Sequence, residues 1–98
     1  MSTVLILADF ASEKATKATV EIATAGAVIG EVTALVLAPV GKGAAYAASI
    51  NQGPVTKVLV IESDDFVRHG VAACADALAH VIGQISPSAV LVVSHAFG

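Results

Sequence analysis

The chain has 98 residues, of which 56% are hydrophobic and 13% charged, with a formal net charge of −3 and one cysteine. This composition excludes intrinsic disorder, which requires low hydrophobicity and high charge, and a nucleic-acid binder that relies on a basic surface. It also excludes a disulfide framework within the chain. The length allows one domain with a small core.

A mean hydropathy of +0.84 raises the alternative of a membrane protein. A membrane-spanning helix needs about 18 or more consecutive apolar residues with few charges. Charged residues interrupt both of the longest apolar stretches. Glu21 and Glu31 lie in the first stretch, and Asp76 lies in the second. The N-terminus has no basic region, and its apolar run is too short for a signal peptide. We therefore expect a soluble protein without membrane insertion, located in the bacterial cytoplasm.

The first predicted element is a strand over residues 3–8, a continuous apolar run typical of strands buried on both faces. A polar loop follows, and then a helix over residues 16–29 that Gly30 ends. Val20 and Val28 lie away from the helix face expected to pack on a sheet, which indicates a further contact. At about 100° per residue, that face is formed by Ala15, Ala18, Ile22, Ala25 and Ile29.

A second strand is predicted over residues 32–38. It leads to a short Ala-rich helix over residues 43–50, after which Asn51, Gly53 and Pro54 break the chain.

Two glycines before this short helix raise the question of a phosphate-binding loop. The segment Gly41-Lys42-Gly43 lacks the spacing of a P-loop and its following Ser or Thr. Tyr46 stands where a dinucleotide motif would have its third glycine. We therefore interpret the segment as a plain turn into a helix.

A third strand over residues 57–61 precedes the clearest predicted helix, residues 66–85, which Pro87 ends. A fourth strand covers residues 89–94. The apolar face of the helix repeats at intervals of four and three residues, at Val71, Ala75, Leu78, Ile82 and Ile85. The order βαβαβαβ predicts an α/β fold, an open parallel sheet with helices on both faces.

The third helix carries four residues that suggest a metal site: His69, Cys74, Asp76 and His80. His69 and His80 are separated by about 16 Å along the helix axis, so they cannot share one ion. Asp76 and His80 can supply two ligands, but no third is evident. We interpret this polar stripe as the solvated face of the helix. Cys74 lies off it, toward the buried side, as expected of a small core residue rather than a nucleophile.

One further place for chemistry is the crevice beyond the carboxyl ends of the strands, where the strand order reverses. If the order is third, second, first, fourth, the crevice lies between the first and fourth strands. Its rim would be Asp9, Phe10, Ser94 and His95. Ser94 and His95 are neighbours in sequence, which does not make a triad. We assign no catalytic, cofactor-binding or metal-binding residue.

Several passages occur in a distinctive succession: the strand VLILAD, the helix ATVEIATAGAVIG leading directly into EVTALVLAP, the strand GPVTKVLVIES and the ending SPSAVLVVSHAFG. In order and spacing they resemble the N-terminal domain of the electron transfer flavoprotein alpha subunit of the bacterial type. The resemblance extends over essentially all 98 residues, and its specificity lies in the succession rather than in one motif.

This resemblance implies a Rossmann-like fold related to adenine nucleotide hydrolases, and a scaffold role in an electron carrier rather than a conventional enzyme. Family members pair with a beta subunit, hold FAD in the heterodimer, and carry electrons from dehydrogenases such as acyl-CoA dehydrogenases to a quinone oxidoreductase. Their FAD contacts come mainly from a C-terminal domain with motifs that are missing here. We therefore expect residues 1–98 to form a truncated domain, ending after the fourth strand, that binds no FAD alone.

Two other functions remain open at this stage. One is a small nucleotide-binding sensor of the universal-stress type, for which a late glycine-rich loop is missing. The other is a small enzyme that uses the crevice near Asp9 and His95. If the domain ends after the fourth strand, it lacks the helix and strand that would follow. Exposed apolar area is therefore expected near residues 90–93 and at Val20 and Val28, and it would promote self-association.

Overall fold

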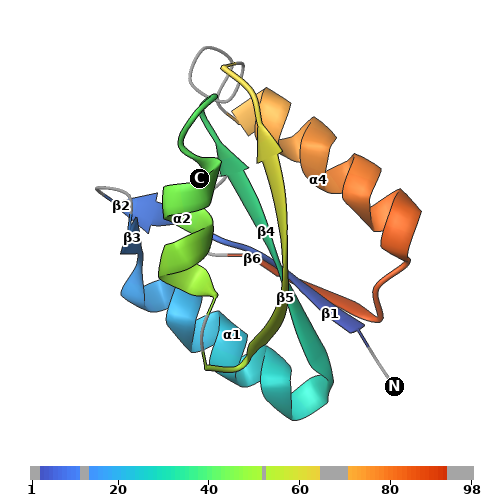
Figure 1. The fold of residues 1–98 in the computed structure, drawn as a ribbon. Coiled ribbons are helices and arrows are strands. Elements are labelled where there is room, and N and C mark those ends of the chain that lie inside the picture. The colour runs from blue at the N-terminus through green and yellow to red at the C-terminus, as the bar shows by residue number, and fades with distance from the viewer. Residues whose placement is uncertain (1–2, 12–13, 52, 65–70, 93–98) are drawn as a thin grey trace.

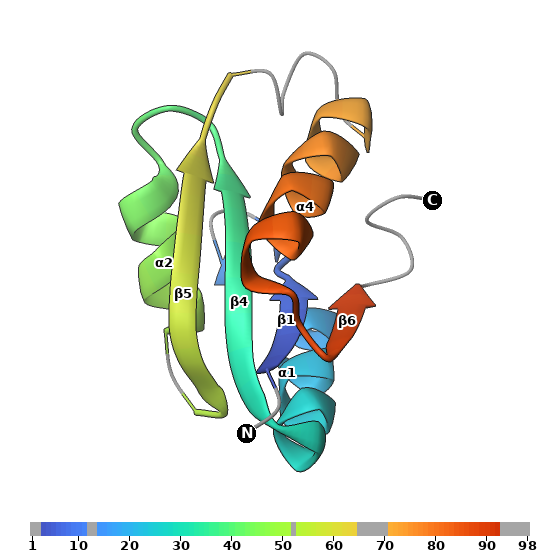
Figure 2. The same ribbon diagram turned by 90° about the vertical axis from the view of Figure 1, so that its right-hand side faces the viewer.

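The computed structural model describes residues 3–11, 14–51, 53–64 and 71–92 (Figures 1 and 2). Its elements in chain order are β1 (Thr3–Leu7), β2 (Phe10–Ala11), β3 (Lys14–Ala15), α1 (Lys17–Ile29), β4 (Glu31–Ala38), α2 (Gly43–Ile50), β5 (Val55–Glu62), α4 (Val71–Ile85) and β6 (Ala89–Val92).

The main sheet has four parallel strands in the order β5-β4-β1-β6. This is the order of third, second, first and fourth strand on which the placement of the crevice was conditional. Helices α1 and α2 cover one face and α4 the other (Figures 1 and 2). The predicted α/β fold, an open parallel sheet with helices on both faces, is therefore confirmed.

The segment after β1 differs from the polar loop that was expected. Its residues form a short antiparallel hairpin, in which Phe10 pairs with Ala15 and Ala11 with Lys14. The backbone N–H of Ala15 donates to the hydroxyl of Ser49, which ties the hairpin to α2. Strands of two residues are too short for hydrophobic periodicity to predict them.

The two faces of the sheet carry different apolar residues, because successive side chains of a strand point to opposite sides. Val and Ala predominate toward α1 and α2, whereas Leu predominates toward α4. The first core contains Val4, Ile6, Ala8, Ala23, Val32, Ala34, Val36, Ala38, Ile50 and Val55. The second core contains Leu5, Leu7, Leu35, Leu78 and Val81.

Helix α1 lies within one residue of the predicted bounds, and its buried face is rotated from the predicted one. Its buried residues are Thr19, Ala23 and Gly26, whereas Ala25 and Ile29 are exposed. A Cβ atom on Gly26 would lie 3.1 Å from the side chain of Val4, so the helix backbone lies close to the sheet at this glycine. Ala15 and Ile22 of the predicted face pack against the core, but the prediction missed the fully buried positions because it gave no weight to Thr and Gly.

Helix α4 ends at Ile85, as predicted. The predicted start at residue 66, together with His69, lies outside the described residues. Leu78 is buried, and Ile82 and Ile85 pack against the same core, but Ala75 is exposed. Val81 is buried and was not predicted. The contact face is therefore rotated slightly from the expected one.

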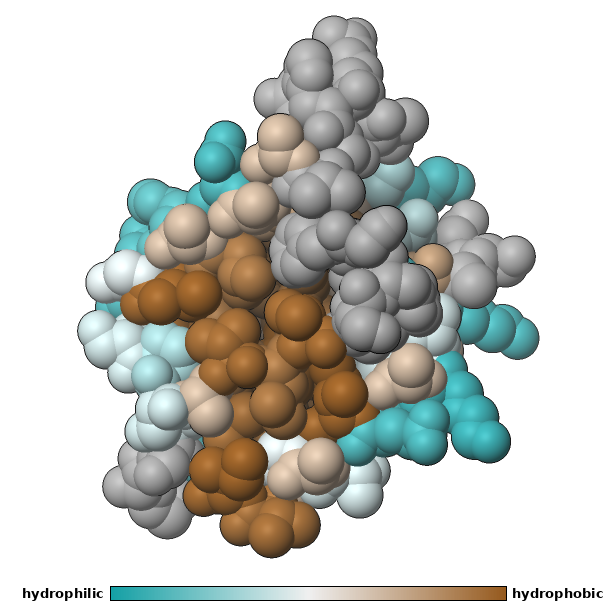
Figure 3. Space-filling model, turned by 180° about the vertical axis from the view of Figure 1, so that it is seen from behind, coloured by the Kyte–Doolittle hydropathy of each residue, from teal (hydrophilic) through white to brown (hydrophobic). Residues whose placement is uncertain are grey.

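Strand β6 lies at the edge of the sheet, and among the described residues only one helical layer covers it. Ala89 and Leu91 pack against the core on the side of α1 and α2. Val90 and Val92 pair with Leu5 and Leu7 and share their face, yet they are 36% and 38% exposed. Figure 3 shows apolar side chains gathered on the side of the molecule that is turned away in Figure 1.

The exposed apolar area expected from the sequence is thus present at four described residues, Val20, Val28, Val90 and Val92. Residue 93 lies outside the described part of the chain.

Candidate functional site

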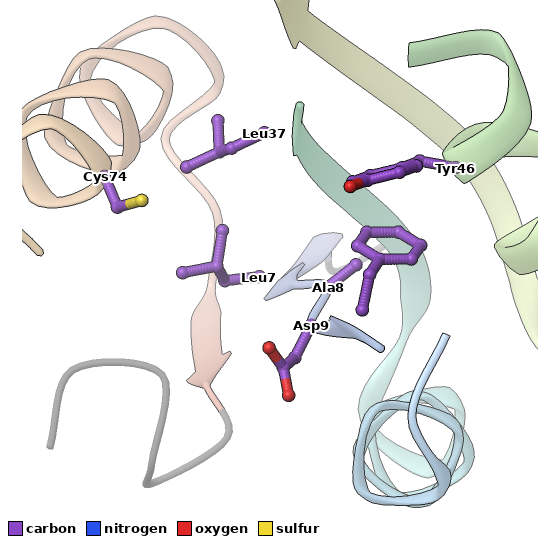
Figure 4. A pocket seen from close by; sticks show the side chains of 7 residues that line it. Leu7, Ala8, Asp9, Leu37, Tyr46 and Cys74 are labelled. Atoms are coloured by element: carbon purple, nitrogen blue, oxygen red, sulfur yellow. The ribbon is translucent and has the colours of Figure 1, made fainter. Parts of the chain in front are cut away.

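A pocket of about 180 Å³ lies at the carboxyl ends of β1 and β4 (Figure 4). Seven residues line it: Leu7, Ala8, Asp9, Phe10, Leu37, Tyr46 and Cys74. They come from β1, β4, the hairpin, α2 and α4, so the pocket extends over the edge of the sheet from one helical layer to the other. Ligands of open α/β sheets bind at this edge.

Two aromatic rings form one side of the pocket. The rings of Phe10 and Tyr46 have their centroids 4.5 Å apart at an interplanar angle of 32°. Phe10 comes from the hairpin and Tyr46 from α2, so the hairpin positions a ring that a loop would leave unsupported. The hydroxyl of Tyr46 points toward the same space as the sulfur of Cys74 (Figure 4).

Buried threonine hydroxyls fix the backbone of Asp9. The fully buried Thr19 hydroxyl accepts a hydrogen bond from the Asp9 N–H at 2.8 Å and donates to the Asp9 carbonyl at 3.2 Å. Since its one proton is used there, the hydroxyl of Thr16, 3.0 Å away, donates to Thr19. The Thr16 N–H also donates to the Asp9 carbonyl, and its hydroxyl caps α1 by accepting from the Thr19 N–H.

Cys74 contributes a thiol from α4. Its side chain is partly buried, and its sulfur points toward Leu7 and Leu37 (Figure 4). Burial raises the pKa of the thiol above its usual value, which keeps it protonated and weakly nucleophilic near neutral pH. The geometry agrees with the predicted core role, with the addition that Cys74 lines the pocket.

The beginning of α2 answers the question of a phosphate loop. The N–H of Gly43 donates at 2.7 Å to the carboxylate of Glu62, which lies at the end of β5. A Cβ atom on Gly43 would lie 2.6 Å from the side chain of Val60, so this approach requires glycine. A carboxylate of the chain itself therefore occupies the end of α2 that attracts anions. The interpretation of Gly41-Lys42-Gly43 as a plain turn agrees with this geometry.

The structure brings together only some of the residues considered from the sequence. Asp9 and Phe10 line the pocket, whereas Ser94 and His95 lie outside the described residues. Asp76 and His80 are exposed on α4, as the interpretation of a solvated face requires. In the part of the chain that the structure describes, no group of three or more His, Cys, Asp or Glu could hold a metal ion.

Sequence reasoning did not assign Leu37, Tyr46 and Cys74 to the site. Leu37 could have been found, since it ends a strand that neighbours β1. Tyr46 and Cys74 belong to helices on opposite faces of the sheet, and no sequence pattern places them at one pocket.

The fold and the pocket define a class: a Rossmann-like α/β domain with a cavity at the carboxyl edge of its parallel sheet. Within that class, residues 4–98 match the family described as the electron transfer flavoprotein domain. Because this match includes nearly the whole chain, the chain belongs to that family. Curated protein sequences contain no significant match. Among the described residues, no helix is long and apolar enough to cross a membrane.

Proposed function

We propose that the chain acts as a scaffold and interaction domain of the alpha subunit of a heterodimeric electron transfer flavoprotein in the bacterial cytoplasm. In this proposal the assembled protein holds FAD and carries electrons from dehydrogenases, such as acyl-CoA dehydrogenases, to a quinone oxidoreductase. The chain contributes an interaction surface to that assembly, and the flavin carries out the redox chemistry.

The observation that carries the proposal is the exposed apolar surface beside β6. Val90 and Val92 lie on the sheet face whose other strands contribute to the core beneath α4, yet no described residue covers them. Val28 and Ile29 at the end of α1 are also exposed, by 88% and 53%. Exposed apolar residues of this kind support a role in protein association.

The described residues do not fit FAD. The pocket of about 180 Å³ is smaller than the range of about 300–1,000 Å³ typical of small-molecule sites. Among its described lining residues, Asp9 is the only charged one and a poor neighbour for a pyrophosphate, and Glu62 already occupies the beginning of α2. These features support a cofactor held by other parts of the assembly. They also lend less support to the alternative of a nucleotide-binding sensor.

The test is co-purification with the electron transfer flavoprotein beta subunit encoded in the same genome. We expect the 98-residue chain to bind it and, when purified alone, to show no flavin absorbance. The double variant Val90→Thr and Val92→Thr keeps β-branched side chains but makes the surface polar, so it should weaken binding while the chain stays folded.

Val60→Thr is the matched control, since Val60 is 43% exposed on β5 at the opposite edge of the sheet. It should leave binding unchanged. Stoichiometric flavin in the isolated chain, or equal binding by the double variant and the wild type, would contradict the proposal.

A further inference from the structure

Strand β5 lies at the end of the sheet opposite β6, and among the described strands only β4 pairs with it (Figure 2). We propose that two copies of the chain associate at this edge, with their β5 strands antiparallel and side by side, so that the two sheets become one. The proposal is independent of the scaffold role, because it uses other residues and another partner.

The backbone of β5 is suited to pairing with a further strand. An edge strand carries N–H and C=O groups without partners in its own sheet, and these form a template for another chain. Residues Lys57–Glu62 pair with β4 in continuous register, and the register shift lies before them. Between these charged ends the strand reads VLVI, and Val60 in this stretch is exposed. Edges are usually protected by charges, proline or a bulge, so an uninterrupted apolar stretch at an edge indicates a partner.

The helix beside this edge presents small, uncharged side chains. Tyr46 and Ser49 of α2 contact the hairpin. At about 100° per residue, Ala44 and Ala48 lie on the opposite side of the helix, which is turned outward past β5, and both are exposed. Surface helices usually show charged residues to water, whereas α2 has none over its eight residues.

An antiparallel pair brings the edge strand and this helix face into one interface. A two-fold axis perpendicular to the sheet keeps both copies of α2 on the same side of the joined sheet. Helix α2 packs on β4 and β5 alike, so its axis lies about half a strand spacing inside β5. With strands about 4.8 Å apart, the two α2 axes would lie about 10 Å from each other. Helices pack at about 8–10 Å, and Ala44 and Ala48 leave room for this approach.

The charges of β5 also fit an antiparallel copy. Lys57 lies at the beginning of the regular stretch, whereas Glu62 lies at its end and Asp64 two residues later, and all three are exposed. In an antiparallel pair the basic end of each strand lies beside the acidic end of the other. A parallel pair would bring like charges together, which is unfavourable. The hydrogen bond from the Gly43 N–H uses one of about four acceptor positions of the Glu62 carboxylate, so Glu62 can still attract a lysine.

The experiment measures the mass of the 98-residue chain by sedimentation equilibrium over a range of concentrations. We expect a reversible change from one chain of 9.7 kDa to a pair and no further, because a two-fold axis closes the assembly. Hydrogen exchange locates the contact, since the amides of residues 57–62 should exchange more slowly as concentration rises. A monomer at every concentration, growth beyond the pair, or concentration-dependent protection of β6 instead of β5 would overturn the proposal.

Ala44→Glu and Ala48→Glu test the contact between the helices. Both positions are exposed and glutamate favours a helix, so the single chain should stay folded. Each change places a carboxylate where the two helices meet, and should raise the dissociation constant of the pair about tenfold or more. Ala79→Glu makes the same change at an exposed position of α4 and should leave the constant unaltered. Equal dissociation constants for these variants and the wild type would overturn the proposal.

Two further variants test the charges and separate this edge from β6. Lys57→Glu makes both ends of the strand acidic and should weaken the pair about fivefold. Lys17→Glu changes the net charge equally at an exposed position of α1 and should have no effect. The double variant Val90→Thr and Val92→Thr should still form the pair. Loss of the pair in this variant alone would assign self-association to β6 and overturn the proposal. Binding of the beta subunit is measured separately, so the proposed function and this proposal can fail independently.

Discussion

Helices cover the two faces of the sheet to different extents. Toward α1 and α2 the core includes residues from all four strands, and small helix residues such as Ala23 and Gly26 allow close packing. Toward α4 the core draws on β1, β4 and β5, and the valines of β6 remain exposed. The face toward α1 and α2 is packed across all four strands, whereas the face toward α4 leaves apolar surface exposed at β6.

The largest expected effect compares a buried with an exposed position on the sheet face toward α4. The quantity compared is the loss in free energy of unfolding. Leu35→Ala removes a fully buried side chain and should lower the free energy of unfolding by about 2–5 kcal/mol, through lost burial and a cavity. Val92→Thr, on the same face but 38% exposed, should change it by no more than about 0.5 kcal/mol. Urea unfolding measures both. Similar losses would mean that β6 is covered in solution.

A pair of glycine substitutions compares the two helical layers. Gly43→Ala places a Cβ atom against Val60 and Glu62 at the start of α2, and should cost about 1–3 kcal/mol in stability. Gly83→Ala on α4 meets nothing within 4 Å and should stabilise the chain by about 0.5–1 kcal/mol, since alanine favours a helix. Opposite shifts in melting temperature are expected. Stabilisation by both would show that α2 is not held closely against β5.

A third comparison concerns the support of the pocket. Thr19→Val keeps the shape of the side chain but leaves the Asp9 N–H without its acceptor, which should cost about 1–3 kcal/mol. Thr24→Val removes an exposed hydroxyl that bonds only within α1, and should be close to neutral. Chemical denaturation of both variants measures the difference. Equal stabilities would indicate that the segment around Asp9 is held by other contacts.

Much of the fold could be predicted from the sequence because its signals are local. Continuous apolar runs mark strands buried on both faces, and the bounds of α2 agree with the prediction. The buried face of α1 could not be obtained in this way, since contact there depends on Thr19 and Gly26, which an apolar pattern ignores. Of the residues that line the pocket, Asp9 and Phe10 were predicted because they follow a strand. Tyr46 and Cys74 reach the pocket only through the packing of α2 and α4.

The bond between Gly43 and Glu62 has a consequence for the order of folding. Helix α2 has eight residues, no side-chain cap of its own and no acidic residue in its first turn. A helix of this length is marginal in water. Its beginning is completed by a carboxylate 19 residues later in the chain. During synthesis, α2 is therefore expected to become stable only once β5 has emerged and paired with β4, so that this crossover forms as one unit.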